Sequence, residues 1–131
     1  ACKARHGTAR FRRIGPKYSY MSIAQSCRTC KHPTCISKCR KDAIRRENGG
    51  EIAINSKCVG CGLCAKYCGF GAIEIIDAGS ENGKQKRMAN KCEHCRGYSN
   101  CACVSECPTG AIKHVEPRAY FKHLLTQHEV K

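Results

Sequence analysis

Cysteine is the residue type that can carry chemistry in this chain, because fourteen of its 131 residues are cysteine. Most of them form three runs, each of which opens with C-x-x-C, closes with C-x-x-x-C and has Ala-Ile four and five residues after its last cysteine. The runs are Cys27, Cys30, Cys35 and Cys39, then Cys58, Cys61, Cys64 and Cys68, and last Cys92, Cys95, Cys103 and Cys107. A 4Fe–4S cluster takes one thiolate for each iron, and the spacing C-x2-C-x2-C-x3-C of the middle run serves such clusters. The runs therefore predict several bound 4Fe–4S clusters.

Disulfide bonds and structural zinc are the two other common uses of so many cysteines. A disulfide framework does not require three runs that end alike, and the short spacings within these runs suit metal chelation better. Structural zinc takes two C-x2-C pairs that lie far apart in the sequence. Here each pair is followed by a third and a fourth cysteine, so that zinc binding would leave thiolates without a metal. Cluster ligation is therefore favoured over both alternatives.

The third run is irregular, because Cys101 and Cys103 both precede Cys107. The other runs separate their third and fourth cysteines by three residues, and the pair Cys103 and Cys107 keeps that spacing. We therefore expect Cys103 to be a ligand and Cys101 to be a spare thiol. His32 and His94 also lie within runs, and a histidine ligand would raise the potential of a cluster. Since enough cysteines are present, we interpret both histidines as polar neighbours of the clusters.

The composition offers little material for an apolar core. Hydrophobic residues make up 41% of the chain, a share that includes the fourteen cysteines, and the aromatics comprise five Tyr and three Phe. A chain of this size and composition should depend on bound metal for its stability, with cluster binding coupled to folding. No stretch is long and apolar enough to predict a membrane-spanning helix.

The chain is strongly basic, with a net charge of +14 when cysteines are counted as neutral. Three oxidised clusters with their thiolates would bring a charge of about −6, which gives the loaded protein a net charge of about +8. Two interpretations of this charge stay open. The basic side chains either solvate the protein and screen the anionic clusters, or they steer it to an acidic partner protein. No nucleic-acid-binding motif accompanies the charge, so we expect no nucleic-acid partner.

Turn residues and alternating patterns predict a few short elements around the motifs. The turn sequence at 47–50 predicts a hairpin that links the first two motifs, and residues 77–83 form an expected polar loop. The expected strands are residues 43–46, 51–55, 72–76, 84–89 and 111–115, the last of which ends before Pro117. The tail places Tyr120, Phe121, Leu124 and Leu125 at helical spacing. Such a helix either packs on its own domain or docks on a partner subunit, and the second interpretation is slightly favoured.

The order of the motifs resembles the iron–sulfur electron-transfer subunits of the DMSO reductase type. Similar proteins include formate dehydrogenase beta subunits, hydrogenase-linked polyferredoxins, and the small subunits of tungsten aldehyde and benzoyl-CoA enzymes. The resemblance covers nearly the whole chain and is carried by residues 22–35, 57–64, 90–95 and 102–111, which look like the second, third and fourth motifs of that family. It implies an α+β fold of the bacterial-ferredoxin-like dicluster kind, with short β-hairpins and short helices around 4Fe–4S clusters.

The resemblance also implies a division of the chain into four segments. They are a basic N-terminal arm at 1–20 that carries Cys2, a two-cluster ferredoxin module at 21–83, a third cluster motif at 84–116 that packs with the arm, and a C-terminal docking tail at 117–131. Of the first motif of the family only Ala1-Cys2-Lys3 is present. Either the chain is a natural three-cluster form, or an N-terminal segment is missing from it.

The ligand sets are expected from a rule of two-cluster ferredoxins, in which the fourth cysteine of each run binds the other cluster. The first cluster is expected on Cys27, Cys30, Cys35 and Cys68, the second on Cys58, Cys61, Cys64 and Cys39, and the third on Cys92, Cys95, Cys103 and Cys2. Cys101 and Cys107 are then left over. In the competing arrangement the third motif is self-contained and Cys107 binds its own cluster. Arg40 and Gly69 stand where the family often has proline after the last cysteine, which makes solvent shielding of the clusters less certain.

By resemblance, the chain is expected to relay single electrons in anaerobic metabolism between a catalytic oxidoreductase subunit and another redox partner, as part of a hetero-oligomer. The catalytic subunit is expected to be of the molybdenum- or tungsten-pterin type, and otherwise a hydrogenase or CO dehydrogenase. The expected location is cytoplasmic, with membrane association only through a partner. No acid–base pair, nucleophile or nucleotide motif stands out in the sequence, so no catalysis by the chain itself is predicted. The alternative is a free soluble polyferredoxin that carries electrons.

Overall fold

The computed structural model describes residues 1–10, 12–14, 23–81 and 83–128. The rest of the predicted arm, Asn82 of the predicted loop and the last three residues of the predicted tail lie outside this range. The helices are α1 (Cys2–His6), α2 (Thr34–Ser37), α3 (Leu63–Lys66), α4 (Ala102–Ser105) and α5 (Pro117–His128). The strands are β1 (Arg12–Ile14), β2 (Ile23–Gln25), β3 (Ile44–Arg46), β4 (Ile52–Ile54), β5 (Glu74–Glu81) and β6 (Lys84–Asn90). Short helices and antiparallel hairpins confirm the predicted α+β class.

The strands form three separate two-stranded antiparallel sheets, which pair β1 with β2, β3 with β4, and β5 with β6. The predicted hairpin around 47–50 is confirmed, with Ile44 opposite Ile54. The predicted polar loop at 77–83 is wrong in its extent, because β5 continues to Glu81 and pairs there with Lys84. A shift in register between Asp77 and Ser80 lets the strand absorb the polar residues as a bulge. The polar composition predicted a loop, but pairing with β6 makes these residues part of a strand.

The expected strand at 111–115 is wrong as well. These residues are all described and have no regular secondary structure. A strand needs a neighbour for its backbone groups, and among the described residues none pairs with this stretch. The N-terminal arm, for which no element was predicted, begins with the short helix α1, whose C-cap Gly7 has φ 74°. The local sequence did not reveal either outcome.

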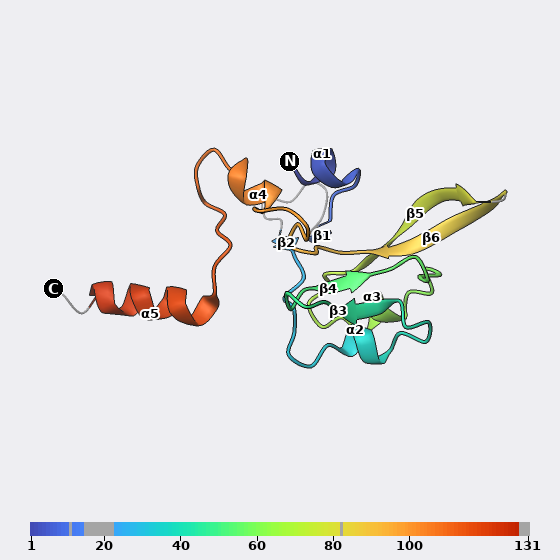
Figure 1. The fold of residues 1–131 in the computed structure, drawn as a ribbon, viewed down its shortest axis with the longest axis horizontal. Helices are drawn as coiled ribbons and strands as arrows, with labels where there is room; N and C mark the ends of the chain where they lie inside the picture. The colour runs from blue at the N-terminus through green and yellow to red at the C-terminus, as the bar shows by residue number, and fades with distance from the viewer. Residues whose placement is uncertain (11, 15–22, 82, 129–131) are drawn as a thin grey trace.

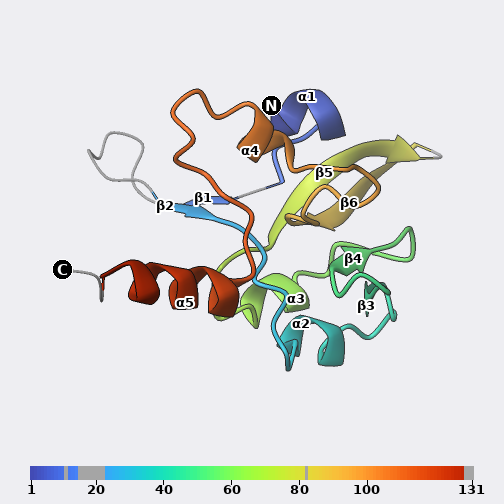
Figure 2. The ribbon, with the colours of Figure 1, turned by 60° about the vertical axis from the view of Figure 1, so that its left-hand side comes forward.

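The molecule has two lobes that meet around β6 and the segment before α2 (Figure 1). One lobe contains α2, α3 and the β3–β4 hairpin, and the other contains α1, α4 and the β1–β2 hairpin. Figure 2 shows α1 and α4 side by side, as Figure 1 does. The buried hydrophobic residues fall into two small clusters. Ile44, Ile52, Cys64, Ile73 and Ala89 form the first cluster, and Cys95, Cys101 and Ala102 form the second.

Helix α5 confirms the predicted helical tail. Pro117 is its first residue, a position that tolerates the missing N–H of proline, and the Glu116 carboxylate accepts a hydrogen bond from the Ala119 amide at 2.7 Å. The helix is set apart from the two lobes (Figure 1), and its Phe121 and Leu125 are exposed. No helix in the described ranges combines the length and the apolar character that a membrane crossing requires.

Candidate metal centres

The three cysteine motifs fold in the same way. The third cysteine of each motif is the second residue of a four-residue helix, so that Cys35, Cys64 and Cys103 occupy equivalent places in α2, α3 and α4. The fourth cysteine comes shortly after each of these helices. Cys101 is the N-cap of α4, a position that Pro33 and Gly62 occupy in the other two motifs. This repeat supports Cys103 rather than Cys101 as the third cysteine of the last motif.

The backbone of the motifs repeats as well, including conformations that are costly for residues with side chains. The residue before the second cysteine has positive φ in all three motifs, at Thr29 (44°), Gly60 (65°) and His94 (52°). The third residue after the last cysteine of each motif also has positive φ, at Asp42 (48°), Gly71 (59°) and Gly110 (64°). Non-glycine residues in this region are uncommon and cluster at functional sites. The recurrence indicates a loop geometry required by what the loops bind.

The first predicted site joins cysteines from two motifs. Burial raises the pKa of the Cys35 thiol, and the nearby Cys27 and Cys68 thiols raise it further. Cys68 is the last cysteine of the second motif, so the structure brings it to the first motif, as the crossing rule predicts. Cys30 completes the predicted set and is half-buried.

The second predicted site lies beside the first one. Burial raises the pKa of Cys64 to about 11, to which the nearby Cys58 and Cys61 thiols contribute. Cys35 of the first site also raises this pKa, which shows that the two sites are neighbours. Cys39, the predicted fourth ligand, accepts a hydrogen bond from the Ala43 amide at 3.3 Å.

The third predicted site is a cavity of about 370 Å³ between the N-terminal residues and the last motif. Five cysteines line it, namely Cys2, Cys92, Cys95, Cys101 and Cys103. Burial raises the pKa of Cys92, and the Cys27 and Cys103 thiols act in the same direction. Because Cys27 belongs to the first site, the third site also adjoins the first.

Cys101 was expected to be a spare thiol, yet it lies inside this cavity. Its side chain is only 8% exposed, and its thiol donates a hydrogen bond to the His94 carbonyl at 3.4 Å. Burial raises its pKa, and the thiols of Cys95, Cys103 and Cys92 add to that rise. The cavity therefore contains one thiol more than a 4Fe–4S cluster needs.

Cys107 stands apart from the five cysteines and does not line the cavity. The hydroxyl of Thr109 lies 3.6 Å from its sulfur. That hydroxyl, followed by the backbone amides of Ile112, Thr109 and Ala111, lowers the pKa of Cys107 to about 7. Hydrogen bonds from the chain therefore stabilise its thiolate. No other cysteine contributes to this lowering of the pKa.

The N-terminal residues lie directly on the third motif. The Arg5 guanidinium donates to the Asn100 carbonyl at 2.6 Å and lies over the Tyr98 ring, 4.8 Å from its centroid. Arg10 forms an ion pair of 2.7 Å with Glu93. Cys2 itself accepts a hydrogen bond from the Arg10 amide at 3.3 Å. These contacts place Cys2 at the third site although it is far from the last motif in the sequence.

Two functional candidates were missed by the sequence reasoning. Lys91 is 2% exposed, and its ammonium donates to the Cys92 carbonyl at 2.8 Å. Burial raises the pKa of Cys35 and of Cys92, and the Lys91 charge opposes both rises, so this ammonium lies between the first and third sites. The other candidate is His6, whose Nε2 is 3.3 Å from the Cys95 sulfur. Lys91 and Lys57 each stand directly before a C-x-x-C, so the sequence alone does not distinguish the buried lysine from the exposed one.

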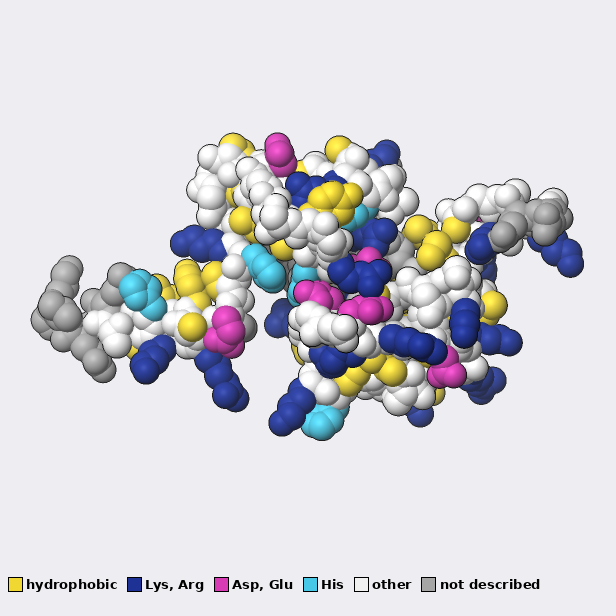
Figure 3. Space-filling model, viewed as in Figure 1, with side chains coloured by type: hydrophobic (Ala, Val, Ile, Leu, Met, Phe, Trp, Pro, Cys, Tyr) yellow, Lys and Arg dark blue, Asp and Glu magenta, His cyan; other side chains and the backbone are white. Residues whose placement is uncertain are grey.

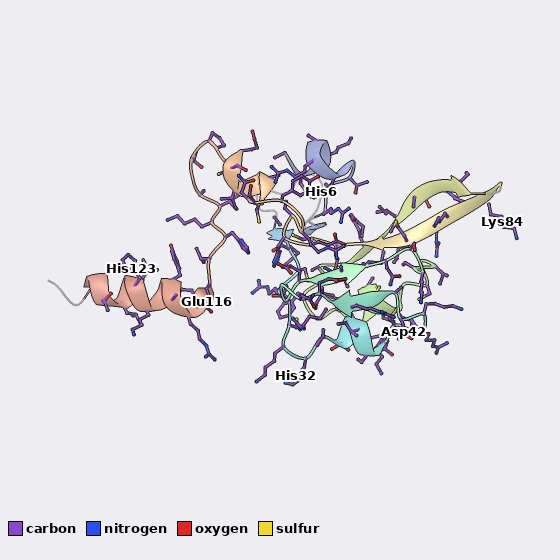
Figure 4. All side chains as sticks on the ribbon, viewed as in Figure 1. His6, His32, Asp42, Lys84, Glu116 and His123 are labelled. Carbon is purple, nitrogen blue, oxygen red and sulfur yellow. The ribbon has the colours of Figure 1, made fainter. Side chains whose placement is uncertain are left out.

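The histidines within the motifs behave as polar neighbours. His94 Nε2 is 2.8 Å from the carbonyl oxygen of Cys27, so the ring links the third motif to the first. His32 is exposed and lies at the outer edge of the lobe that contains α2, whereas His6 lies beneath α1 (Figure 4). His94 lines the cavity of the third site, but its Nε2 contacts the Cys27 carbonyl rather than a thiol, which favours cysteine ligation.

The donor set fits 4Fe–4S clusters. Backbone amides donate hydrogen bonds of 3.3–3.4 Å to thiols at all three motifs, and such bonds stabilise thiolates and tune cluster potentials. The accepting thiols are those of Cys39, Cys58, Cys92 and Cys95. Across the described residues, no three His, Cys, Asp or Glu side chains converge closely enough to hold a single metal ion. A cluster of four irons instead takes one thiolate for each iron around a larger body.

Comparison with known proteins identifies the class. Residues 57–120 match the 4Fe-4S dicluster domain family. The chain is 33% identical over 110 residues to the putative electron transport protein YsaA of Escherichia coli, which covers 83% of this chain and 67% of YsaA. It is 33% identical over 101 residues to the electron transport protein HydN of the same organism, covering 70% of this chain and 58% of HydN. It is also 33% identical over 98 residues to the putative oxidoreductase AegA of that organism, covering 74% of this chain and 15% of AegA.

The chain therefore belongs to the family of ferredoxin-like 4Fe–4S electron transport proteins. The predicted ferredoxin-like fold and the predicted 4Fe–4S cofactor are confirmed by this membership together with the short antiparallel hairpins. The chain spans less than two thirds of HydN and a small part of AegA, so whatever those whole proteins do is a separate question.

Proposed function

We propose that this chain holds three 4Fe–4S clusters in a row and relays single electrons between a catalytic oxidoreductase subunit and a second redox partner. The observation that carries the proposal is the grouping of the cysteine thiols into three adjoining sites. When bound, each 4Fe–4S cluster exchanges one electron at a time. The residues of the chain hold the clusters, bury all but one of the thiols at least in part, and donate hydrogen bonds to several of them.

The proposed ligand sets are the crossed ones. The thiol neighbours of Cys35 support the presence of Cys68 at the first site, and the shared cavity supports Cys2 at the third. Cys30 and Cys61 complete the first and second sites by their places in the repeat. The exclusion of Cys107 from the cavity favours the crossed arrangement over a self-contained third motif.

The order of the sites is second, first, third. Cys64 of the second site adjoins Cys35 of the first, and Cys27 of the first adjoins Cys92 of the third. This linear order supports a relay, since electrons that enter at one end have a continuous row of sites to the other. The four proposed segments of the chain agree with this order, with the module at 21–83 holding two sites and the arm at 1–20 closing the third with residues 84–116.

The catalytic partner in this proposal is an oxidoreductase subunit of the molybdenum- or tungsten-pterin type, located in the cytoplasm. The similarity to AegA supports a link with oxidoreductases, because there a stretch similar to this chain occupies only 15% of a putative oxidoreductase. The tail at 117–131 is the proposed docking element, and the exposed Phe121 and Leu125 of α5 support that role. The alternative is a free carrier.

Coulometric reduction of the anaerobic protein, followed by low-temperature EPR, tests the relay. We expect about three electrons per chain and spin–spin interaction among the reduced clusters, because the sites adjoin. Storage of one or two electrons, or signals from magnetically isolated clusters, would contradict the proposal. The size of the native protein then separates the two roles, since a stable hetero-oligomer indicates a subunit and a monomeric pool indicates a carrier.

A further inference from the structure

The second cluster site reaches the surface more openly than the other two. All fourteen cysteines lie within the described residues, and Cys61 alone is exposed, whereas the others are half-buried or buried. Val59, two residues before Cys61, is 56% exposed. Electron transfer between proteins slows steeply with distance, so a partner that exchanges electrons with this row of sites gains most by docking where a ligand thiol meets solvent.

A groove of about 650 Å³ is lined by Cys58 and Val59, which belong to the same C-x-x-C as Cys61. We call it the basic groove and define it by Lys57, Cys58, Val59, Lys84, Lys86 and Arg87, all of which line it. It combines the exposed apolar side chain of Val59 with four cationic side chains and includes Cys58, a proposed ligand of the second cluster. The groove therefore adjoins the second site through Cys58.

Direct contacts hold the groove in shape. The Ala89 amide of β6 donates to the Cys58 sulfur at 3.3 Å, and Arg87 Nη2 donates to the Gly60 carbonyl at 3.3 Å. Gly60 lies so close to β6 that a Cβ there would be 2.7 Å from backbone atoms of Arg87. The strand that bears the cations is thus packed on the loop that bears the ligands, which fixes the charges relative to the second site.

The charge of the groove is one-sided. Lys57, Lys84 and Arg87 are not buried, and Lys84 lies at the tip of the β5–β6 hairpin (Figure 4). In the space-filling view, several Lys and Arg side chains lie at the hairpin end of the molecule (Figure 3). Asp77 pairs with Arg87 in the hairpin register but lines a different cavity. The charged side chains that line the groove are therefore all cationic, and they attract an anionic surface.

We infer that the basic groove is the docking site for an acidic electron-transfer protein, which exchanges single electrons with the second cluster site. This inference rests on the proposed relay and names the place and the charge of one of its partners. One exposed apolar side chain among side chains of like charge suits fast, transient association, because the charges raise the association rate while the contact stays weak. In the exchange one electron moves between the two proteins, and no bond forms or breaks.

The test uses the loaded protein with Lys57 and Lys84 both changed to glutamate. The matched control changes Lys31 and Arg45 to glutamate, which alters the net charge equally at two exposed places that do not line the groove. The reduced proteins are mixed by stopped flow with hexacyanoferrate(III), an anion, and with hexaamminecobalt(III), a cation. At low salt we expect the groove variant to react about tenfold more slowly with the anion and faster with the cation, while the control changes little. Equal changes in both variants would overturn the inference, because net charge alone would then explain them.

A macromolecular probe completes the test. An acidic flavodoxin should exchange electrons with the unmodified protein at a rate that falls with added salt, and Lys57→Glu with Lys84→Glu should abolish that salt dependence. Groove-dependent binding of a mixed-sequence DNA duplex with no effect on flavodoxin would overturn the inference in favour of nucleic acid. The coulometric count is measured on the same samples. If fewer than three electrons are stored while the groove effect remains, the cluster count fails and the docking site stands.

Discussion

The Ala-Ile pair that follows each cysteine run is buried in one lobe and exposed in the other. In the lobe that contains α2 and α3, the Ala-Ile pairs after Cys39 and Cys68 are buried, and Ile44 and Ile73 are each 2% exposed. In the third motif the equivalent Ala111 and Ile112 are exposed, the latter at 47%. The difference lies in the next element of the chain, since the first two pairs lead into hairpins and the third leads to Pro117 and α5. A repeat of ligands therefore does not ensure a repeat of packing.

The two lobes are also held together differently. Three isoleucines contribute to the core of the lobe that contains α2 and α3, whereas the core of the other lobe consists of Cys95, Cys101 and Ala102. The third site depends instead on polar anchors, such as the 2.7 Å ion pair between Arg10 and Glu93. A partly exposed pair of this kind contributes little to stability by itself. We therefore expect bound metal to matter to both lobes and most of all to the third-motif lobe.

The largest expected effect is that of removing iron. Anaerobic chelation should abolish cooperative thermal unfolding and most of the far-ultraviolet circular dichroism, because the apolar cores are too small to hold the fold. Partial chelation should release the arm first, which can be followed by proteolysis near residues 1–10. A cluster-free protein that stays folded would break the comparison, since apolar packing would then suffice in both lobes.

The next largest effect separates Cys2 from Cys107. Cys2→Ala should convert the third cluster to a three-iron form or lose it, because one iron lacks its thiolate. Cys107→Ala and Cys101→Ala should leave the iron content nearly unchanged. Iron analysis and low-temperature EPR report the result. Loss of iron in Cys107→Ala with an intact Cys2→Ala protein would show that the third motif is self-contained.

A smaller effect is expected from the buried ammonium between the lobes. Lys91→Met should lower the potentials of the first and third clusters by roughly tens of millivolts, because a positive charge stabilises the more negative reduced form. The second cluster should shift less. Lys57→Met is the matched control, since Lys57 also precedes a C-x-x-C but is exposed. Equal shifts of all three potentials in both variants would mean that Lys91 has no special position.

The smallest effect concerns one thiol. Because Thr109 and then the neighbouring amides lower the pKa of Cys107 to about 7, its alkylation by iodoacetamide should rise with pH around 7 rather than around 9. Thr109→Ala should move this rise to higher pH. Mass spectrometry of the labelled protein identifies the site. Protection of Cys107 at every pH tested would indicate that it is bound to a cluster.

Sequence reasoning predicted the elements that depend on local signals. The turn at 47–50 indicated the β3–β4 hairpin, and the spacing of Tyr120, Leu124 and their neighbours indicated α5. The strand expected at 111–115 failed because pairing depends on a distant partner. The bulge in β5 was missed for a similar reason, since pairing with β6 outweighs the polar composition.

The grouping of cysteines could be anticipated only in part. Spacing and the crossing rule placed Cys68 with the first motif, and the thiol neighbours of Cys35 agree with that placement. The burial of Lys91 and Cys101 could not be predicted, because it arises where segments distant in the sequence pack together. Sequence spacing reports which thiols can act together, whereas tertiary packing decides which charges surround them.

Iron and acid-labile sulfide analysis of the anaerobic protein tests the central claim, the binding of three clusters, most directly. Three complete sites predict about twelve irons and about twelve sulfides per chain, with no zinc. A value of about eight of each would contradict a third cluster in the cavity that contains Cys2, and with it the proposed role of the N-terminal arm.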